Sequence, residues 1–248
     1  MNIVDGIYSR NPLREKVPYR RTRDVVSLYG NLTKFKREGK TGIISEFKRR
    51  SPSGFDIRKE VNPLHYFREL RLENLAGISV LTEPDLFLGS YEDITAVQEL
   101  NLPILDKDFA SSELMVENAF NAGADVILFI LDFLEPERVL SLSRYAVSLG
   151  MEALVEFHDI SLIKYLTPQE GVIYGYNRRN LRTLKMEPHE EEVLRRLKGI
   201  EINVVLESGI DSAYLRDHDV FPYLGMLIGT SILNGDFLQD APEDDNKA

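Results

Sequence analysis

The stretch EFKRRSPSG, residues 46–54, contains side chains that could perform acid–base chemistry. It follows the apolar run Gly42-Ile43-Ile44, which predicts a buried strand. Alternate residues of a strand point to the same side, so Glu46 and Lys48 should enter one space at the strand's carboxyl end. A carboxylate beside an ammonium group can hold, donate or accept protons there, whereas a surface ion pair is the alternative explanation. The arrangement recurs along the chain, which favours a site for acid–base chemistry over a surface ion pair.

The same order, an apolar run and then a charged or polar residue, is repeated further along the chain. Lys107 follows the run 104–105, Glu156 follows 154–155, and Asn177 and Arg179 follow 172–174. Two lysines and two glutamates that follow buried runs are hard to explain as ordinary polar loops. The candidate catalytic residues are therefore Glu46, Lys48, Lys107, Glu156, Asn177 and Arg179.

Two later turns have the composition of a phosphate site. Ser208-Gly209 follows the apolar run 204–206, and Gly229-Thr230-Ser231 follows the run 226–228. Such turns bring backbone N–H groups near a helix N-terminus, where an anion is favoured, and glycine lets the anion approach the backbone. Ordinary helix-capping turns are the alternative, since Ser and Thr are good N-caps. The candidate phosphate ligands in these turns are Ser208, Gly209, Gly229 and Thr230.

The elements that must position these residues form a regular series. Apolar runs at residues 43–44, 78–81, 104–105, 126–130, 154–155, 172–174, 204–206 and 226–228 predict eight strands. Amphipathic helices are predicted between them, including residues 64–73, 113–121 and 135–149. Eight strands that alternate with helices predict a closed (β/α)8 TIM barrel, an α/β fold whose active site lies at the carboxyl ends of the strands. A doubly wound open sheet is the competing layout, but the chain lacks the GxGxxG turn that would favour it.

Residues 1–40 differ from the rest because they are rich in Arg and Lys. A helix is predicted over residues 27–36, and we expect the segment to form an N-terminal helical extension packed on a barrel of residues 41–248, within one domain overall. A nucleic-acid-binding arm is the alternative. It is disfavoured because few aromatic residues interleave with the charges.

The composition of the chain disfavours some classes of binding partner and indicates the compartment in which the protein is expected. Lys plus Arg total 30 against 40 for Asp plus Glu, so the net charge of −10 disfavours general nucleic-acid binding. The chain has no cysteine, no signal-peptide pattern and no apolar run of the length that a membrane helix needs. We expect a cytoplasmic protein, a monomer or weak homodimer, with no nucleic-acid or membrane partner. The acidic tail from Asp236 is expected to take no part in the fold.

Seven segments together resemble the indole-3-glycerol phosphate synthase family of tryptophan biosynthesis. They are EFKRRSPSG, LTEPDLFLGSYED, ILDKDF, EALVEFHD, YNRRNL, LESGI and LIGTSI, in the family's order over residues 41–233. The resemblance implies a carboxy-lyase that needs no metal and no cofactor. Its phosphorylated small-molecule substrate would be 1-(2-carboxyphenylamino)-1-deoxyribulose 5-phosphate, and its products indole-3-glycerol phosphate, CO2 and water.

The resemblance also implies a role for each candidate residue. Lys107 would be the general acid, Lys48 would bind the substrate carboxylate, and Glu156 would act as base or stabiliser in the dehydration. Glu46 would orient the two lysines, while Asn177 and Arg179 would add polar contacts, with Arg179 holding Glu156 or the ribulose hydroxyls. The apolar walls of the aromatic pocket would be Phe87, Phe109, Leu128 and Leu181, and Ser51 would join the two turns around the phosphate.

Some residues depart from what the resemblance predicts. Tyr176 and Arg178 stand where a small aliphatic and a small polar residue are expected. Asp106 adjoins Lys107, where a facing carboxylate would raise the pKa of that lysine, but strand alternation should turn Asp106 away from the lumen. Asp132 adds negative charge near the predicted mouth, and Tyr8 is a weak candidate for an aromatic that faces the substrate ring.

Two other functions remain open at this point. One is a different phosphate-binding barrel, such as a phosphoribosyl isomerase. These isomerases commonly use a Cys or Asp pair, and the chain has no cysteine. The other is a ligand-binding barrel without catalysis, which would be expected to lose Lys107 or Glu156, and both are present.

Overall fold

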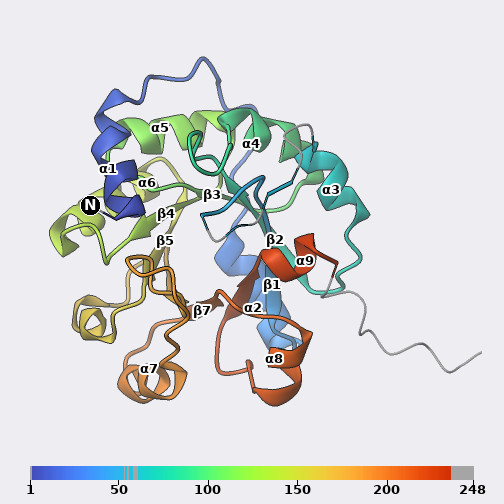
Figure 1. Cartoon of the computed structure of the whole chain (residues 1–248), viewed down its shortest axis with the longest axis vertical. Coiled ribbons are helices and arrows are strands. Elements are labelled where there is room, and N and C mark those ends of the chain that lie inside the picture. Colours follow the sequence, from blue (N-terminus) through green and yellow to red (C-terminus); the bar gives the residue numbers. More distant parts are fainter. Residues whose placement is uncertain (1, 53, 55, 58–60, 236–248) are drawn as a thin grey trace, which may run out of the picture.

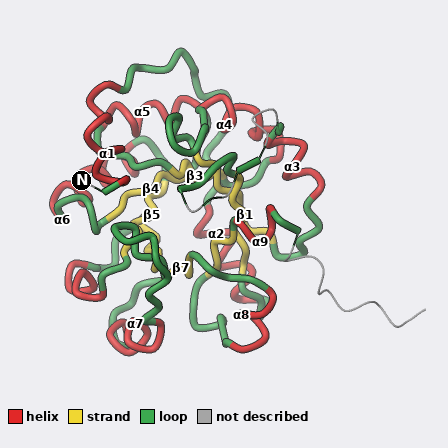
Figure 2. Tube along the Cα trace, viewed as in Figure 1, coloured by secondary structure: helices red, strands yellow, loops and turns green. Residues whose placement is uncertain are grey.

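A computed structural model of the chain describes residues 2–52, 54, 56–57 and 61–235. Its strands are β1 (Gly42–Phe47), β2 (Leu75–Leu81), β3 (Ile104–Lys107), β4 (Val126–Ile130), β5 (Glu152–Phe157), β6 (Val172–Asn177), β7 (Val204–Glu207) and β8 (Gly225–Ile228). Each strand pairs in parallel with the next, and β8 pairs back with β1. Figure 2 shows the strands as an inner ring with the helices outside it. The predicted (β/α)8 barrel is confirmed, and the open sheet is excluded.

Helices connect the strands and extend the chain at its N-terminal side (Figure 1). The α-helices are α1 (Ile3–Arg10), α2 (Leu28–Arg37), α3 (Pro63–Glu69), α4 (Tyr91–Val97), α5 (Glu113–Ala122), α6 (Pro136–Ser148), α7 (Glu190–Leu197), α8 (Ser212–Asp217) and α9 (Thr230–Leu233). Short 3-10 segments are η1 (Asn11–Leu13), η2 (Gln98–Leu100) and η3 (Ile160–Tyr165), and η3 takes the place of a helix between β5 and β6.

The predicted helices agree with the structure except at one end. α5 and α6 match the predicted ranges within a residue, and Gly123 provides the left-handed C-cap of α5 at φ 104°. α3 ends at Glu69 rather than at residue 73, because Leu70 is extended. Leu70 and Leu72 both pack against the apolar core between the strands and the helices. Side chains two residues apart point to the same side in an extended chain but not in a helix.

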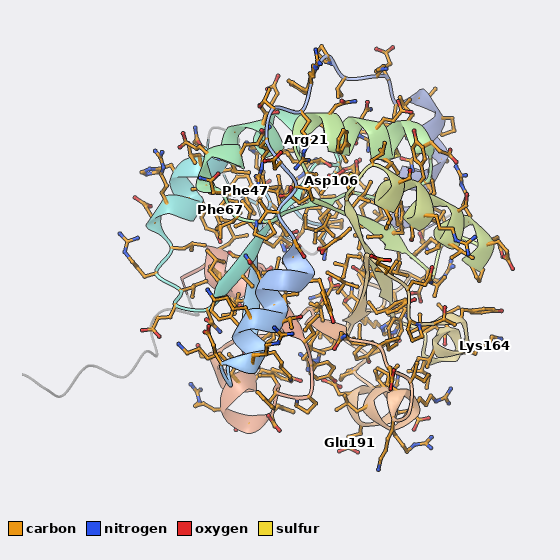
Figure 3. The ribbon with its side chains drawn as sticks, turned by 180° about the vertical axis from the view of Figure 1, so that it is seen from behind. Arg21, Phe47, Phe67, Asp106, Lys164 and Glu191 are labelled. Carbon is orange, nitrogen blue, oxygen red and sulfur yellow. The ribbon has the colours of Figure 1, made fainter. Side chains whose placement is uncertain are left out.

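Strand alternation divides the apolar side chains into two cores. On β4, Ile127 and Phe129 face the helices, while Leu128 and Ile130 belong to the core inside the barrel. Figure 3 labels Phe47 and Phe67 at the outer core, where α3 packs on β1, and their ring centroids are 6.2 Å apart. Each strand thus contributes an inward-facing apolar residue to one layer inside the barrel, which forms the floor of the space above it. The next inward-facing residue of the strand lies one layer nearer the carboxyl ends.

Helix α2 closes the amino-terminal end of the barrel. Leu32 on α2 is fully buried, and a Cβ at Gly42 or Gly225 would lie 2.9 or 2.5 Å from its methyl groups, so glycine makes room for the plug. Seen from behind in Figure 3, α2 lies across this end. Glu152, the first residue of β5, accepts hydrogen bonds from Ser27 Oγ and Leu28 N and so fixes the start of α2.

The segment before α2 is held by Asp125, the residue before β4. Its carboxylate accepts hydrogen bonds from Arg21 Nη2 at 2.6 Å and from Val26 N at 3.1 Å, and Arg23 lies 3.2 Å away. Further toward the N-terminus, Asn11 Nδ2 donates to the carbonyl of Phe109 at 2.7 Å. The extension therefore runs along the barrel from its amino end to the loops at its carboxyl end.

The tail from Asp236 lies outside the described residues, so its expected behaviour stays a prediction. Within the described residues, no helix is long and apolar enough to cross a membrane.

Candidate active site

A cavity of about 790 Å³ opens at the carboxyl ends of the strands. All of the predicted site residues line it: Glu46, Lys48, Lys107, Glu156, Asn177, Arg179, Ser51, Ser208, Gly209, Gly229, Thr230, Phe87, Phe109, Leu128 and Leu181. The strand rule explains why they meet. Glu46, Lys107 and Glu156 each come two residues after an inner-core residue of the same strand, and so take the inward place one layer above the floor.

Lys107 lies at the centre of the polar group. Its Nζ is 2.7 Å from Glu207 Oε2, 3.6 Å from Glu156 Oε2 and 3.7 Å from Glu46 Oε2. Burial by itself lowers the pKa of Lys107, but Glu207, Glu156 and Glu46 together raise it above the usual range for lysine. Lys107 is therefore a charged ammonium in the free protein, fixed at the cavity wall by carboxyl groups from three strands.

Lys48 and Glu46 form the neighbouring pair. Lys48 Nζ donates to Glu46 Oε1 at 2.7 Å, and both side chains are largely buried. Burial raises the pKa of Glu46, but Lys48 and Lys107 outweigh this effect, and the pKa lies below the usual range. Glu46 thus stays ionised and holds both ammonium groups, which is the arrangement that the sequence suggested.

Glu207 is the residue of this group that the sequence reasoning missed. It ends β7, is fully buried and makes the shortest contact with Lys107. Burial raises the pKa of Glu207 to about 8, with Glu156 adding to the effect against the opposing charge of Lys107. The signal was present, because Glu207 follows the inner-core residue Val205 by two, as Lys107 follows Leu105.

Glu156 is positioned by Asn177 rather than by Arg179. Asn177 Nδ2 donates to Glu156 Oε1 at 2.8 Å, while Asn177 Oδ1 accepts from the backbone N–H of Arg179 at 2.9 Å. The guanidinium of Arg179 donates to the carbonyl of Leu184 at 2.9 Å and lines the cavity. Arg179 therefore supports Glu156 only through Asn177, and its side chain faces the space where a ligand would lie.

The apolar side of the cavity combines the barrel and helix α1. Phe87 and Phe109 lie with ring centroids 5.9 Å apart, and Leu128 and Leu181 complete the predicted wall. Additional apolar lining comes from Ile3, Val4 and Ile7 of α1 and from Leu81 and Ile130, which the sequence reasoning did not assign.

Tyr8 lies behind this wall rather than on it. Its ring stacks on Phe133 at 5.7 Å and meets Phe109 edge-on at 6.0 Å. Tyr8 is absent from the lining residues of the cavity, so its position does not support direct contact with a substrate ring.

The polar side of the cavity is formed by the turns after β7 and β8. Ser208 and Gly209 both have left-handed backbone conformations, with φ of 70° and 64°. α9 contains only Thr230–Leu233, so the helix dipole expected from the sequence is short, and any attraction for an anion would depend on individual N–H groups of the turns. Ser231 Oγ donates to the carbonyl of Ile210 at 2.6 Å and ties the two turns together.

Gly229 serves the acid–base group as well as the turn. A Cβ at this position would collide with Glu46 Oε1 and lie 3.1 Å from Lys48 Nζ. Glycine is therefore required because the Glu46–Lys48 ion pair lies close to the backbone at this position. The sequence alone could not show this contact.

We expect Gly229→Ala to lower kcat/KM by about 10- to 100-fold, with kcat reduced and KM raised together, because the added methyl group moves Glu46 and Lys48. Steady-state kinetics would measure this. Gly6→Ala is the matched control, since a Cβ at Gly6 has an ordinary contact of 3.7 Å with Arg10 and Gly6 is not among the lining residues. Unchanged kinetics in Gly229→Ala would refute this account of the ion pair.

The charged departures noted in the sequence lie outside the cavity lining. Asp106 is fully buried on the outer side of β3, where Thr82 Oγ1 donates to it at 2.6 Å, so it does not face the ammonium of Lys107. Asp132 accepts the backbone N–H groups of His158 and Asp159 at 2.8 and 3.0 Å and orders that loop. Among the residues that the structure describes, no group of three or more His, Asp or Glu side chains could hold a metal ion.

The closed barrel and a cavity of paired acids and bases at its carboxyl ends define the class of (β/α)8-barrel enzymes. In fold, the chain resembles the tryptophan synthase α subunit of Legionella pneumophila str. Paris, with a TM-score of 0.60 at 14% identity over 84% of this chain and 87% of that one. The chain belongs to the indole-3-glycerol phosphate synthase family, whose model matches residues 3–242.

Relatives in this family cover nearly the whole chain. The indole-3-glycerol phosphate synthase of Picrophilus torridus is 43% identical over 235 residues, which is 94% of this chain and 93% of that protein. The enzyme of the same name from Thermoplasma volcanium is 41% identical over 233 residues, covering 94% of each.

Proposed function

We infer that the chain closes, decarboxylates and dehydrates 1-(2-carboxyphenylamino)-1-deoxyribulose 5-phosphate to give indole-3-glycerol phosphate, CO2 and water. The observation that carries this inference is the fixed ammonium of Lys107 between an apolar wall and anion-binding turns in one cavity. Family membership and relatives named for this reaction support it.

The cavity offers a separate place for each part of the substrate. Phe87, Phe109, Leu128 and Leu181 accept the aromatic ring, and Lys48 pairs with the ring carboxylate. The phosphate lies on Ser51 and the turns after β7 and β8, and Arg179 faces the ribulose hydroxyls. This placement brings the ribulose carbonyl to the Lys107 side of the cavity.

Ring closure requires a proton donor at the carbonyl oxygen. The ring carbon that bears the carboxylate attacks the ribulose carbonyl carbon, and Lys107 donates a proton to the oxygen, which becomes a hydroxyl. The bond to the carboxylate then breaks, CO2 leaves, and its electron pair restores the aromatic ring. Before the step, the ionised carboxylate of Glu46 holds the ammonium of Lys107 beside the carbonyl oxygen.

Dehydration needs a base and an acid on the same intermediate. Glu156, fixed by Asn177, removes a proton from the carbon next to the hydroxyl-bearing carbon. The hydroxyl leaves as water with a proton from Lys48, or from Lys107 once it has regained a proton, and the double bond of the indole forms. The proton on Glu156 and one proton from solvent then restore the two lysines. Glu207 lies beside both Lys107 and Glu156, which suits it to pass a proton between them after turnover.

The direct test is a fluorescence assay for the indole product. Purified protein is mixed with the carboxyphenylamino-deoxyribulose phosphate in the presence of EDTA, and we expect indole fluorescence to rise. Isothermal titration with the same compound is the parallel measurement. A flat fluorescence trace together with measurable binding would show a ligand-binding barrel and refute the proposed activity.

Other features of the proposed function concern the setting of the enzyme. We propose a cytoplasmic protein that acts as a monomer or weak homodimer, with residues 1–40 as an extension of the barrel of residues 41–248. It would use no cofactor and have neither a nucleic-acid nor a membrane partner. The contacts of Arg21 and Asn11 with the barrel support the one-domain description.

A further inference from the structure

We propose that Arg178 is a positioning residue for the phosphate, which acts from outside the cavity by fixing the turn that follows β7. The inference rests on the proposed function, which places the substrate phosphate at this turn. Arg178 does not line the cavity and would not touch the ligand. Its effect would pass entirely through the backbone of Ser208 and Gly209.

The guanidinium of Arg178 holds two consecutive carbonyl groups. Its Nη1 donates to the carbonyl of Ser208 at 3.1 Å and to the carbonyl of Gly209 at 2.9 Å. All described peptide bonds are trans, and in a trans peptide the C=O and the next N–H point in opposite directions. The N–H groups of Gly209 and Ile210 are therefore directed away from Arg178, toward the cavity that both residues line.

These two N–H groups are available for a ligand. Among the described residues, none accepts a hydrogen bond from the N–H of Gly209 or Ile210. Backbone N–H groups in this state favour an anion with several acceptor oxygens, which a phosphate provides. The Ser231 hydroxyl holds the next carbonyl, that of Ile210, so three successive carbonyls of the turn are fixed from the outer side.

The turn needs such a support because its conformation is costly. Ser208 has φ 70°, a left-handed conformation that a residue with a Cβ adopts rarely, and Gly209 follows at φ 64°. Without the guanidinium, the peptide planes at Ser208 and Gly209 could rotate toward conformations of lower energy. Their N–H groups would then no longer converge on one point.

Arg178 is itself held rigidly. It is 7% exposed, its Nε donates to Glu190 Oε1 at 2.5 Å, and its guanidinium lies over the ring of Tyr214 at 4.0 Å. The hydroxyl of Tyr214 donates to the same Glu190 oxygen at 3.2 Å. The carboxylate from α7 and the ring from α8 thus fix the plane of the guanidinium, which fits a role in geometry rather than in long-range charge.

The test measures phosphate binding without turnover. Inorganic phosphate is titrated into the full chain while the backbone amide resonances of Gly209 and Ile210 are followed by NMR. In the wild type we expect both resonances to shift with phosphate. In Arg178→Met we expect the affinity for phosphate to fall about tenfold. This is the effect expected when the displaced turn loses one well-placed N–H hydrogen bond to the charged phosphate.

Arg21→Met is the matched control. Arg21 is equally buried, pairs with Asp125, donates to the carbonyl of Ala124 at 2.6 Å and lies over an aromatic ring, but at the amino-terminal end of the barrel. We expect it to bind phosphate as the wild type does. An equal loss of affinity in this control, or amides that do not respond to phosphate in the wild type, would overturn the proposal.

Arg178→Lys separates geometry from charge and serves if Arg178→Met fails to fold. A lysine keeps the positive charge beside Glu190 but lacks the planar fork that reaches both carbonyls and the carboxylate. We expect Arg178→Lys to bind phosphate as weakly as Arg178→Met does. Wild-type affinity in Arg178→Lys would overturn the positioning role.

With substrate, both Arg178 variants should show a KM raised about tenfold and a kcat changed by less than about threefold. An inactive wild type whose amides still bind phosphate would refute the proposed function alone.

Discussion

Replacing Lys107 by methionine is expected to lower kcat by about three orders of magnitude while KM stays within about tenfold of the wild type. In the proposed mechanism the ammonium of Lys107 donates a proton to the ribulose carbonyl, and methionine fills a similar space without a proton. The turns and the apolar wall that are proposed to bind the rest of the substrate are not altered by this change. Indole fluorescence under steady-state conditions measures both constants.

Lys48→Met is the matched control for this prediction. Both lysines are held by Glu46, at 2.7 Å for Lys48 and 3.7 Å for Lys107. Because Lys48 is assigned to the substrate carboxylate, its loss should raise KM more than the loss of Lys107 does. A Lys107→Met protein with wild-type kcat would remove Lys107 from the role of acid.

The second large effect is expected in the pH profile and depends on Glu207. Its pKa of about 8 means that Glu207 carries a proton at neutral pH. In this state Glu207 adds no charge to the group around Lys107. Above pH 8 the proton is lost, Glu207 adds one negative charge beside the cavity, and binding of the anionic substrate weakens. We expect wild-type kcat/KM to fall roughly tenfold per pH unit above pH 8.

Glu207→Gln should remove this alkaline fall, because glutamine cannot lose a proton. Its activity at pH 7 should be reduced less than that of Glu156→Gln, which loses the proposed base of the dehydration at every pH. The profile is measured as kcat/KM from pH 6 to 9.5 for the three proteins. An alkaline limb that is unchanged in Glu207→Gln would assign the titration to another group.

The same titration affects stability, and its sign follows from the direction of the shift. The pKa of Glu207 is raised from 4.5 to about 8 in the folded protein, so between these values the folded state holds a proton that the unfolded state lacks. The contribution of Glu207 to the free energy of unfolding is fully present below pH 4.5 and is lost as the pH rises toward 8. Urea unfolding of Glu207→Gln should show a weaker decline over this window.

The barrel could be predicted from the sequence because its signal is local and repeated. Each strand is a short apolar run, and alternation fixes which side chains point inward once a run is found. The same rule placed Lys107 and Glu156, two residues beyond Leu105 and Leu154. Applied to Val205, it would also have given Glu207, but the Glu-Ser-Gly sequence was interpreted only as a phosphate turn.

Other features depend on contacts that no local pattern contains. The lining by Ile3 and Ile7 requires knowing where α1 docks, which rests on contacts such as that of Asn11 with the backbone of Phe109. The need for glycine at position 229 comes from a side chain of β1, far away in sequence. Arg178 departs from the family's pattern, and the carbonyl groups of Ser208 and Gly209 that it binds are distant from it in sequence.

The docking of α1 has a consequence for how the cavity could change its preference. The proposed acids and bases lie on the strands of the barrel or directly after them, whereas part of the apolar wall is contributed by helix α1, which contacts the barrel through side-chain packing and a few polar contacts. Residues 3–10 therefore line the cavity without contributing a proposed acid or base. We expect a helix with smaller or larger side chains at this place to change the size of the ring that fits the cavity more than it changes the proton transfers.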